Sequence, residues 1–437
     1  MRADRRQFLG ALTLPVLDGL MPGSWAATLT SHAPAVLAEL ARTPGSAEAL
    51  AGDETFWFQV QQAFAVDRSL INLNNGGVSP SPAPVMEALK RQLDLTNQAP
   101  AYTLWTLQEP QRETVRTGLA ALFGADREEV AVTRNASESL QILQFGHDLQ
   151  RGDEVVTTTQ DYPRMIATFQ QRERREGIVL KQIEIPVPCE DPSEIVRRFE
   201  AALTSRTKLM LMCHTINLTG QILPVREVVA MGRKHGVPVL VDGAHSFAQF
   251  PFRQADLDCD YYAASLHKWL FAPIGTGLLY VRRDKIPSIW PLMAAPPTLD
   301  KDIRKFEEIG THPAANTLAI SEALTFHQGL GGARKAARLR WLRDRWARRV
   351  SALDKVRLHT SLDPRYSCAI GCVQIDGVDT TALQQHLWNK HRIFTVAIKH
   401  PQFEGLRVTA SVYTTSDEVD RFSDVMESVA QRGLPVA

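Results

Sequence analysis

The sequence predicts an α/β protein whose main sheet is largely parallel. Between Val130 and Val281, short apolar or β-branched runs alternate with amphipathic segments of helical length. The runs are continuously hydrophobic rather than alternating, which indicates strands buried on both faces under layers of helices. With 437 residues, 44% of them hydrophobic, the chain can bury a large core and is expected to form two domains.

The elements of the first domain can be placed individually. We expect strands at the runs EVAVT, DEVVTTT, KLMLMCH, VPVLVDG, CDYYAAS and TGLLYVRR. A helix is expected over DPSEIVRRFEAAL, because Asp191 suits the N-cap and Pro192 the first helical position. On that helix Ile195, Phe199 and Leu203 recur on one face. Ligands of such sheets bind beyond the carboxyl ends of the strands.

A second, smaller α/β domain is expected after the proline-rich stretch WPLMAAPPTLD. It begins with a long arginine-rich helix, ARKAARLRWLRDRWARRVSAL, whose basic residues we interpret as a solvated face rather than a nucleic-acid surface. CAIGCVQID and GLRVTAS are expected strands, and TTALQQHLWNKH is an expected helix. The last helix, in TTSDEVDRFSDVMESVA, is opened by a Thr415/Glu418 capping box. The apolar face of the arginine-rich helix is expected to comprise Leu339, Leu342, Trp346 and Val350.

The first 26 residues are expected to form an export signal rather than part of the fold. The pair Arg5-Arg6 precedes a moderately apolar stretch, and Ser24-Trp25-Ala26 fits a signal-peptidase site. This order resembles a twin-arginine signal, which implies the twin-arginine translocation machinery as a partner and a periplasmic mature protein. The alternative is a frayed basic N-terminus. No other segment approaches the ~18 apolar residues of a membrane span.

Charge and cysteine content favour a small-molecule site. Lys+Arg 49 against Asp+Glu 48 leaves a formal charge of +1, so there is no general electrostatic reason to bind nucleic acid or an anionic membrane. Five cysteines are too few and too scattered for a disulfide framework. Cys368 and Cys372 lack a nearby histidine, so no metal site is expected.

Polar groups gather where the predicted strands end. Asn135-Ala136-Ser137 begin a helix, and free backbone N–H groups there suit a phosphate. Asp242 ends a wholly apolar strand, where a carboxylate either caps the next turn or pairs with a cation. The following strand leads to Ser265, His267 and Lys268, so Asp242 and Lys268 can face one ligand. This combination predicts pyridoxal 5′-phosphate (PLP), with a Schiff base at Lys268 and Asp242 at the ring nitrogen.

The stretches VDGAHSFAQF and DYYAASLHKWLFAPIGTGLLYVRR resemble the class V aminotransferases of fold-type I, and in particular their isopenicillin-N-epimerase-like branch. The resemblance extends from INLNNGG, at Ile71, to LRVTASVYTTSDEVDRF. It implies a fold-type I PLP-dependent transferase: a large domain with a mainly parallel seven-stranded sheet between helices, plus a smaller α/β C-terminal domain. The implied division is a signal over residues 1–26, an N-terminal segment over 27–82, a PLP-binding domain over 83–310 and a small domain over 311–437.

The resemblance also implies roles for individual residues. Arg407 stands where the family binds the substrate α-carboxylate, which suits the forked guanidinium. Thr276 and Gly310–His312 fall where a neighbouring subunit approaches the phosphate, which implies a homodimer with a shared active site. The implied cofactor-binding set is Ala136, Ser137, Ser265 and His267 at the phosphate, Thr276 at the phosphate from the neighbouring subunit's side, Tyr162 stacked on the ring, Asn217 at its 3-oxygen, His245 against the cofactor, Asp242 at the pyridinium nitrogen and Lys268 at the aldehyde.

Several of these residues also have a purely structural interpretation. Tyr162 can be a packing aromatic, and Arg407 can be a surface arginine on an edge strand. Asn217 and His245 can be ordinary polar groups at strand ends.

The expected function is that of an exported PLP-dependent enzyme acting on an amino acid or an amino-group-bearing peptide or metabolite, by aminotransferase or epimerase-like chemistry. A PLP-dependent carbon–sulfur lyase and a non-catalytic binding protein on the same fold are the alternatives. Cysteine desulfurases of the class need a mobile cysteine shortly before the carboxylate-binding arginine, and no cysteine follows Cys372. Thr311-His312-Pro313 replace the TRD of the epimerase-like enzymes, which argues against isopenicillin N as the substrate.

Overall fold

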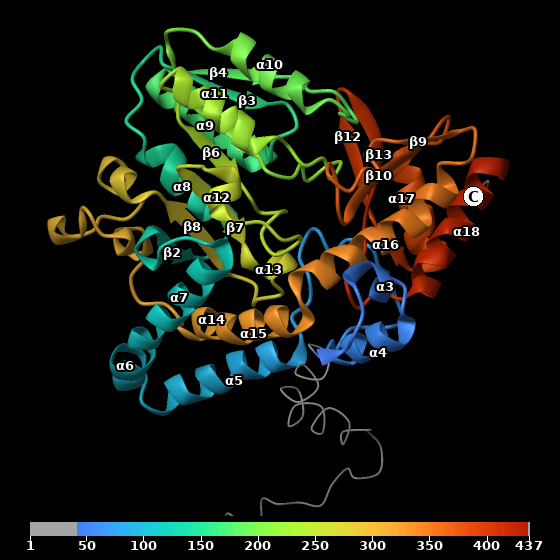
Figure 1. Ribbon diagram of the computed structural model, residues 1–437, viewed down its shortest axis with the longest axis horizontal. Coiled ribbons are helices and arrows are strands. Elements are labelled where there is room, and N and C mark those ends of the chain that lie inside the picture. Colours follow the sequence, from blue (N-terminus) through green and yellow to red (C-terminus); the bar gives the residue numbers. More distant parts are fainter. Residues whose placement is uncertain (1–41, 436–437) are drawn as a thin grey trace, which may run out of the picture.

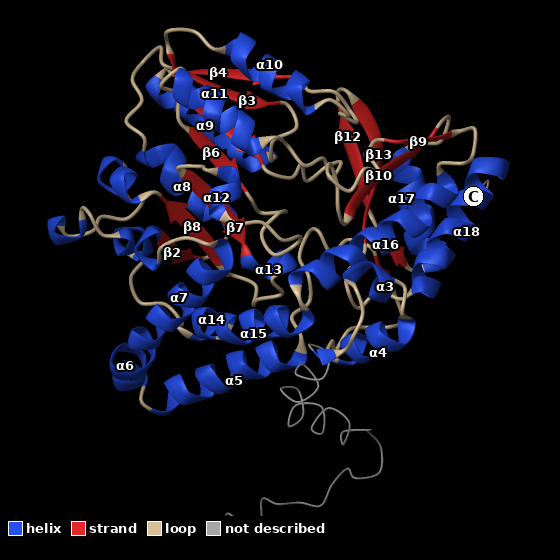
Figure 2. Ribbon diagram, viewed as in Figure 1, coloured by secondary structure: helices blue, strands red, loops and turns tan. Residues whose placement is uncertain are grey.

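The structure, a computed structural model, describes residues 42–435, and the expected export signal over residues 1–26 lies outside them. Two sheets organise the chain (Figure 1). A seven-stranded sheet forms the larger part, and a four-stranded sheet lies beside it in the smaller part. Helices cover both faces of the larger sheet (Figure 2).

The larger sheet has the strand order β2-β8-β7-β6-β5-β3-β4. Its neighbouring strands are parallel except at β8, which runs antiparallel to β2 and β7. The six strands predicted from apolar runs are confirmed. The seventh, β4, is an edge strand that those runs missed, because Lys181 and Gln182 interrupt its hydrophobicity. The strands are β2 (Val130–Thr133), β3 (Glu154–Thr158), β4 (Val179–Ile183), β5 (Thr207–Cys213), β6 (Val239–Asp242), β7 (Tyr261–Ser265) and β8 (Gly277–Val281).

Burial of both faces explains the continuous apolar runs. Successive residues of a strand point to opposite faces, so in β5 Met210 packs into one core and Leu211 into the other. The expected α/β architecture is thereby confirmed. The core containing Leu211 includes side chains of α8 (Ala136–Gly146) and α9 (Pro163–Glu176). The core containing Met210 includes side chains of α7 (Arg112–Phe123), α10 (Pro192–Ala202), α11 (Val225–Lys234) and α15 (Ile320–Leu330).

The predicted cap of α10 is confirmed, because the Asp191 side chain accepts a hydrogen bond from the backbone N–H of Ser193. Ile195 and Phe199 of its apolar face are buried. The remaining elements of the larger part are α5 (Ala83–Gln98), α6 (Pro100–Tyr102), η1 (Thr103–Gln108), η2 (Glu109–Gln111), η3 (Arg127–Glu129), α12 (Gln254–Leu257), α13 (Leu266–Trp269), η4 (Arg283–Ser288), η5 (Pro297–Leu299), η6 (Ile303–Glu307) and α14 (Ala315–Leu318).

The smaller part contains an antiparallel sheet of order β12-β13-β10-β9. The strands and helices predicted there are confirmed, including the Thr415/Glu418 capping box of α18. Its elements are α16 (Gly332–Val350), β9 (Val356–Leu358), β10 (Ile370–Ile375), α17 (Thr380–His391), β12 (Val396–His400), β13 (Phe403–Thr409) and α18 (Ser416–Arg432).

The N-terminal segment joins the two parts. It comprises α3 (Ala47–Ala51), α4 (Glu54–Gln62) and β1 (Ile71–Asn72), and β1 pairs in parallel with β11 (Ile393–Phe394) of the smaller part. Helices α14 and α15 come just before α16 in the chain, but they pack against α5 and α7 and so belong to the larger part. The exact boundaries 27–82, 83–310 and 311–437 stay a prediction.

The prediction that the basic residues of α16 form a solvated face is wrong in part. The predicted apolar face is buried as expected, but Lys335, Arg338 and Arg343 are buried too. Arg338 donates to the carbonyls of Ala51 and Thr414, so these cations satisfy backbone oxygens of distant segments. Only the outer arginines form ion pairs with α18, as Arg345 does with Asp420.

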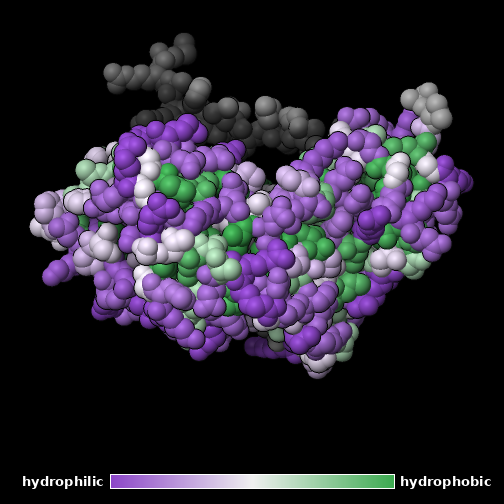
Figure 3. All heavy atoms as spheres, turned by 90° about the horizontal axis from the view of Figure 1, so that it is seen from above, coloured by the Kyte–Doolittle hydropathy of each residue, from purple (hydrophilic) through white to green (hydrophobic). Residues whose placement is uncertain are grey.

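The surface of the protein is largely polar (Figure 3). Figure 3 shows a mostly hydrophilic surface with hydrophobic residues gathered between the two parts. Within residues 42–435 no helix is both long and apolar enough to cross a membrane. The same range contains no group of three or more His, Cys, Asp or Glu side chains arranged for a metal ion, and all five cysteines are free and buried.

Candidate active site

A cavity of about 310 Å³ lies at the carboxyl ends of β5, β6 and β7. This is the edge at which parallel sheets bind ligands. The N-terminus of α8, the start of α9 and the single turn of α13 complete its wall. Nine of the residues predicted from the sequence line this cavity: Ala136, Ser137, Tyr162, Asn217, Asp242, His245, Ser265, His267 and Lys268.

Lys268 projects from α13 into this cavity. Burial lowers the pKa of its amine to about 8, although the nearby Asp242 carboxylate acts in the opposite direction. Its Nζ lies 2.8 Å from Nε2 of His245. Burial, assisted by the charge of Lys268, holds the pKa of His245 well below its ordinary value, so the imidazole is neutral. Lys268 therefore carries an amine that loses its proton close to neutral pH.

Asp242 ends β6 with its side chain 5% exposed. Burial raises the pKa of this carboxyl to about 6. Its Oδ1 accepts a hydrogen bond from the backbone N–H of Ala244 at 2.9 Å, so one oxygen does cap the next turn, as the structural interpretation proposed. The same carboxylate also lines the cavity, and within residues 42–435 it has no ion-pair partner. A buried charge in this position favours a cationic ligand group.

The N-terminus of α8 forms an anion site. Asn135 caps it by accepting from Glu138 N–H, which leaves the N–H groups of the first turn directed at the cavity. The backbone N–H of Ala136 donates to Ser265 Oγ at 3.0 Å, which ties this turn to the end of β7. A Cβ at Gly277 would lie 2.6 Å from the Asn135 backbone, so the glycine permits this close approach.

Arg407 is not a surface residue. It lies on β13, an inner strand of the smaller sheet, with 8% exposure. Its Nη1 donates to the carbonyl of Asn217 at 3.0 Å and its Nη2 donates to Asn74 Oδ1 at 2.8 Å. The positive charge of Arg407 lowers the pKa of Lys268, so the two cations are close in space. Arg407 does not itself line the cavity, but it holds Asn217, which does.

The predicted subunit-contact residues do not line this cavity, although the Thr276 carbonyl accepts from the backbone N–H of Leu266, between the cavity residues Ser265 and His267. The Thr276 hydroxyl is buried and donates to the carbonyl of Pro273 at 2.7 Å. Gly310, Thr311 and His312 line a different hollow, beside α7 and η6. Their contact with a second subunit stays a prediction.

Comparison with known proteins assigns the chain to a family. The sequence profile described as Aminotransferase class-V matches residues 71–422. The chain belongs to the aminotransferase class-V family. It is 28% identical to an isopenicillin N epimerase of Amycolatopsis lactamdurans, over 86% of this chain and 99% of that protein. It is 27% identical to a protein of Mycolicibacterium paratuberculosis named "Probable cysteine desulfurase", over 84% of this chain and 56% of that one.

The fold-type I architecture is confirmed by solved structures. A variant of C-DES with glycine covalently linked to its PLP cofactor matches with a TM-score of 0.74 and 24% identity, over 84% of this chain and 98% of that chain. As a class-V member, the protein is a PLP-dependent enzyme.

The cavity of this class-V enzyme fits PLP chemically. His267 Nδ1, His245 Nδ1 and Asn217 Oδ1 are buried and lack a hydrogen-bond partner within the described chain, so they call for a polar ligand. The α8 N-terminus suits the phosphate, Asp242 the ring nitrogen and Lys268 the aldehyde. The individual contacts to the cofactor stay a prediction.

Two supporting residues were not found from the sequence. Asp161 is wholly buried between β3 and β5, where it accepts hydrogen bonds from Thr157, Thr158 and the Cys213 N–H. It thereby fixes the segment that begins with Tyr162. Asn74 holds Arg407, although 333 residues separate them. The polar run TTTQDY at a strand end was the available signal for Asp161, whereas no local pattern marks Asn74.

Proposed function

We propose that this class-V protein is an exported enzyme that acts on the amino group of an amino acid or an amino-bearing peptide or metabolite, by aminotransferase or epimerase-like chemistry. The observation that carries the proposal is that Lys268 and Asp242, from adjacent strand ends, line one cavity. A non-catalytic binding role would require neither the near-neutral amine nor the buried carboxylate.

Lys268 is the group that would move the substrate α-proton. When bound, PLP supplies a ring that withdraws electrons from the α-carbon and so makes that proton removable. The Lys268 amine, with a pKa of about 8, exists in both protonation states near neutral pH and can therefore take and return a proton. His245 Nε2 lies 2.8 Å from Lys268 Nζ, within hydrogen-bonding distance, and so orients the amine.

Arg407 would hold the substrate α-carboxylate. Two of its five N–H groups are used by Asn217 and Asn74, and its Nε is buried without a partner in the described residues. These bonds fix the guanidinium plane and leave donors for a carboxylate, which is the geometry that guanidinium binds best.

A carbon–sulfur lyase is the second candidate. A relative named as a cysteine desulfurase indicates that this scaffold also serves sulfur chemistry. A desulfurase needs a reactive, accessible cysteine thiolate. Here burial raises the pKa of the Cys372 thiol to about 12, and no cysteine follows it in the chain. Burial also holds the pKa of Cys213, which lines the cavity, well above its ordinary value. Sulfur cleaved from a substrate would therefore be released rather than captured, as in a lyase.

Product analysis distinguishes the candidates. The PLP-loaded protein is incubated in D₂O with a panel of L- and D-amino acids and short peptides. Epimerase-like action gives α-deuteration with inversion, aminotransferase action requires an added keto acid for turnover, and lyase action releases pyruvate, ammonia and hydrogen sulfide from cysteine. Failure of every amino compound to change the absorbance of the bound cofactor would refute the proposed substrate class. Thr311-His312-Pro313 favours a substrate other than isopenicillin N.

The location and assembly belong to the same proposal. The Arg5-Arg6 pair supports twin-arginine export to the periplasm, and exchanging both for lysine is expected to retain the protein in the cytoplasm on cell fractionation. The resemblance at Thr276 and Gly310–His312 supports a homodimer, for which sedimentation equilibrium is the test.

A further inference from the structure

A buried lysine outside the cavity contacts the backbone beside the catalytic lysine. Lys335 belongs to α16, is 0% exposed, and donates from Nζ to the main-chain carbonyl of Trp269. Trp269 follows Lys268 directly and is the last residue of the single-turn helix α13. The final carbonyls of a helix lack partners within the helix and are stabilised by nearby cations.

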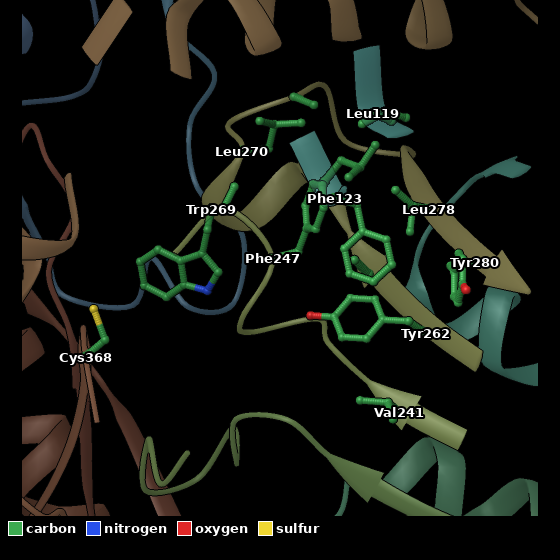
Figure 4. Packing of buried hydrophobic residues seen from close by; sticks show 14 of the residues in the cluster. Leu119, Phe123, Val241, Phe247, Tyr262, Trp269, Leu270, Leu278, Tyr280 and Cys368 are labelled. Atoms are coloured by element: carbon green, nitrogen blue, oxygen red, sulfur yellow. The ribbon is translucent and has the colours of Figure 1, made fainter. Parts of the chain in front are cut away.

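Lys335 also makes a further contact with the chain that follows Lys268. Its Nζ lies 4.1 Å from the ring centroid of Phe271, a residue held in the left-handed region at φ 63°. It also lies 3.4 Å from His327 Nδ1, which is neutral because burial lowers the pKa of His327 to about 3. Figure 4 shows Trp269 and Leu270 of this turn within the core, with the Trp269 ring directed toward Cys368.

Burying an amine is costly unless its hydrogen bonds are satisfied. Burial lowers the pKa of Lys335 well below its ordinary value, and the neighbouring Cys368 is a buried thiol whose own pKa burial raises. An apolar side chain would fill the same space without that cost. The amine therefore serves polar contacts: it donates to the carbonyl of Trp269, and His327 Nδ1 is its second, longer contact.

We propose that Lys335 is a positioning residue for Lys268. By holding the carbonyl of Trp269 and packing on Phe271, it fixes the chain that follows Lys268. The Lys268 amine then stays directed at the cavity toward Asp242. The inference does not depend on which amino compound is the substrate. It also explains why α16 carries a buried lysine, which the proposed PLP chemistry alone does not explain.

Two readouts other than turnover test this inference. The first is hydrogen exchange of the amides between Leu266 and Ala272 in the cofactor-free protein. The second is the dissociation constant for PLP, from the visible absorbance of the bound cofactor. Lys335→Met removes the donor and keeps the chain length, and it is expected to speed this exchange and weaken PLP binding about tenfold or more.

Arg338→Met is the matched control, because Arg338 is equally buried one turn along α16 but donates to Ala51 and Thr414 instead. It is expected to lower the thermal midpoint without changing exchange in the Lys268 turn or PLP affinity. If Lys335→Met does not fold, Lys335→Leu is judged by the same two readouts. Wild-type exchange or wild-type PLP affinity in the folded Lys335 variant, or equal effects in Arg338→Met, would overturn the proposal.

Discussion

Replacing Asp242 by asparagine should have opposite effects on the cofactor-free and the PLP-loaded protein. The substitution keeps an oxygen that can accept the Ala244 N–H and removes only the charge. In the cofactor-free protein the cost of burial outweighs the attraction of Lys268, so that buried charge destabilises the fold. With the protonated ring nitrogen of PLP beside it, the same charge strengthens binding.

The magnitude follows from the pKa of Asp242. Burial raises it from 3.8 to about 6, which corresponds to about 3 kcal/mol of destabilisation once the group is ionised in both states. Below pH 3.8 the carboxyl is protonated in the folded and unfolded chains, so the penalty is absent. As the pH rises from 3.8 to 6 the unfolded chain releases its proton first, and stability falls. Above pH 6 the penalty is complete.

Urea unfolding of the cofactor-free protein above and below this window measures the effect. Asp242→Asn is expected to be more stable than the wild type above pH 6, by up to about 3 kcal/mol, and equal to it below pH 3.8. The same variant should bind PLP up to about 100-fold more weakly at neutral pH. Asp148→Asn, at an exposed loop position, is the control and should change stability by less than about 0.5 kcal/mol. A cofactor-free Asp242→Asn protein less stable than the wild type above pH 6 would refute the reasoning.

Three further predictions concern the groups around the cavity. Arg407→Lys replaces the forked guanidinium, which Asn217 and Asn74 hold in place, by a single ammonium group. KM for an α-amino acid should therefore rise about tenfold or more in steady-state kinetics, and an unchanged KM would contradict the assignment of Arg407 to the substrate carboxylate. Because Lys268 attacks as a neutral amine with a pKa of about 8, stopped-flow PLP attachment should accelerate with rising pH and level off above pH 8; a rate independent of pH would contradict this. Asp161→Asn turns an NH₂ group toward N–H and O–H donors and should lower stability by about 1–3 kcal/mol, which thermal unfolding can check against Asp148→Asn.

Local patterns predicted the elements whose causes are local. The capped helices α10 and α18 and the buried strands β5 and β6 follow from caps and continuous apolar runs within their own residues. β4 was missed because an edge strand exposes part of its surface and needs no such run. The pair Asp242 and Lys268 could be predicted because consecutive parallel strands bring their carboxyl ends to one edge.

The contacts between distant segments could not be predicted in this way. The prediction placed Lys335 and Arg338 on a solvated face of α16. Both are buried because they donate to the carbonyls of Trp269, Ala51 and Thr414, and the helical periodicity of α16 carries no information about these distant segments. Asn74 likewise meets Arg407 because the N-terminal segment pairs with the strands of the smaller part, which lie far from it in the sequence. The family resemblance, rather than helical or strand periodicity, supplied the roles proposed for Tyr162.

The most direct test of the central claim is to locate the covalent bond between the protein and PLP. The PLP-loaded full-length chain is reduced with borohydride, digested, and mapped by mass spectrometry. The pyridoxyl group is expected on Lys268, within AASLHKWLFAPIGTG, and Lys268→Ala should abolish both the label and the visible absorbance of the bound cofactor. A stoichiometric label on another lysine, or full visible absorbance in Lys268→Ala, would contradict the account.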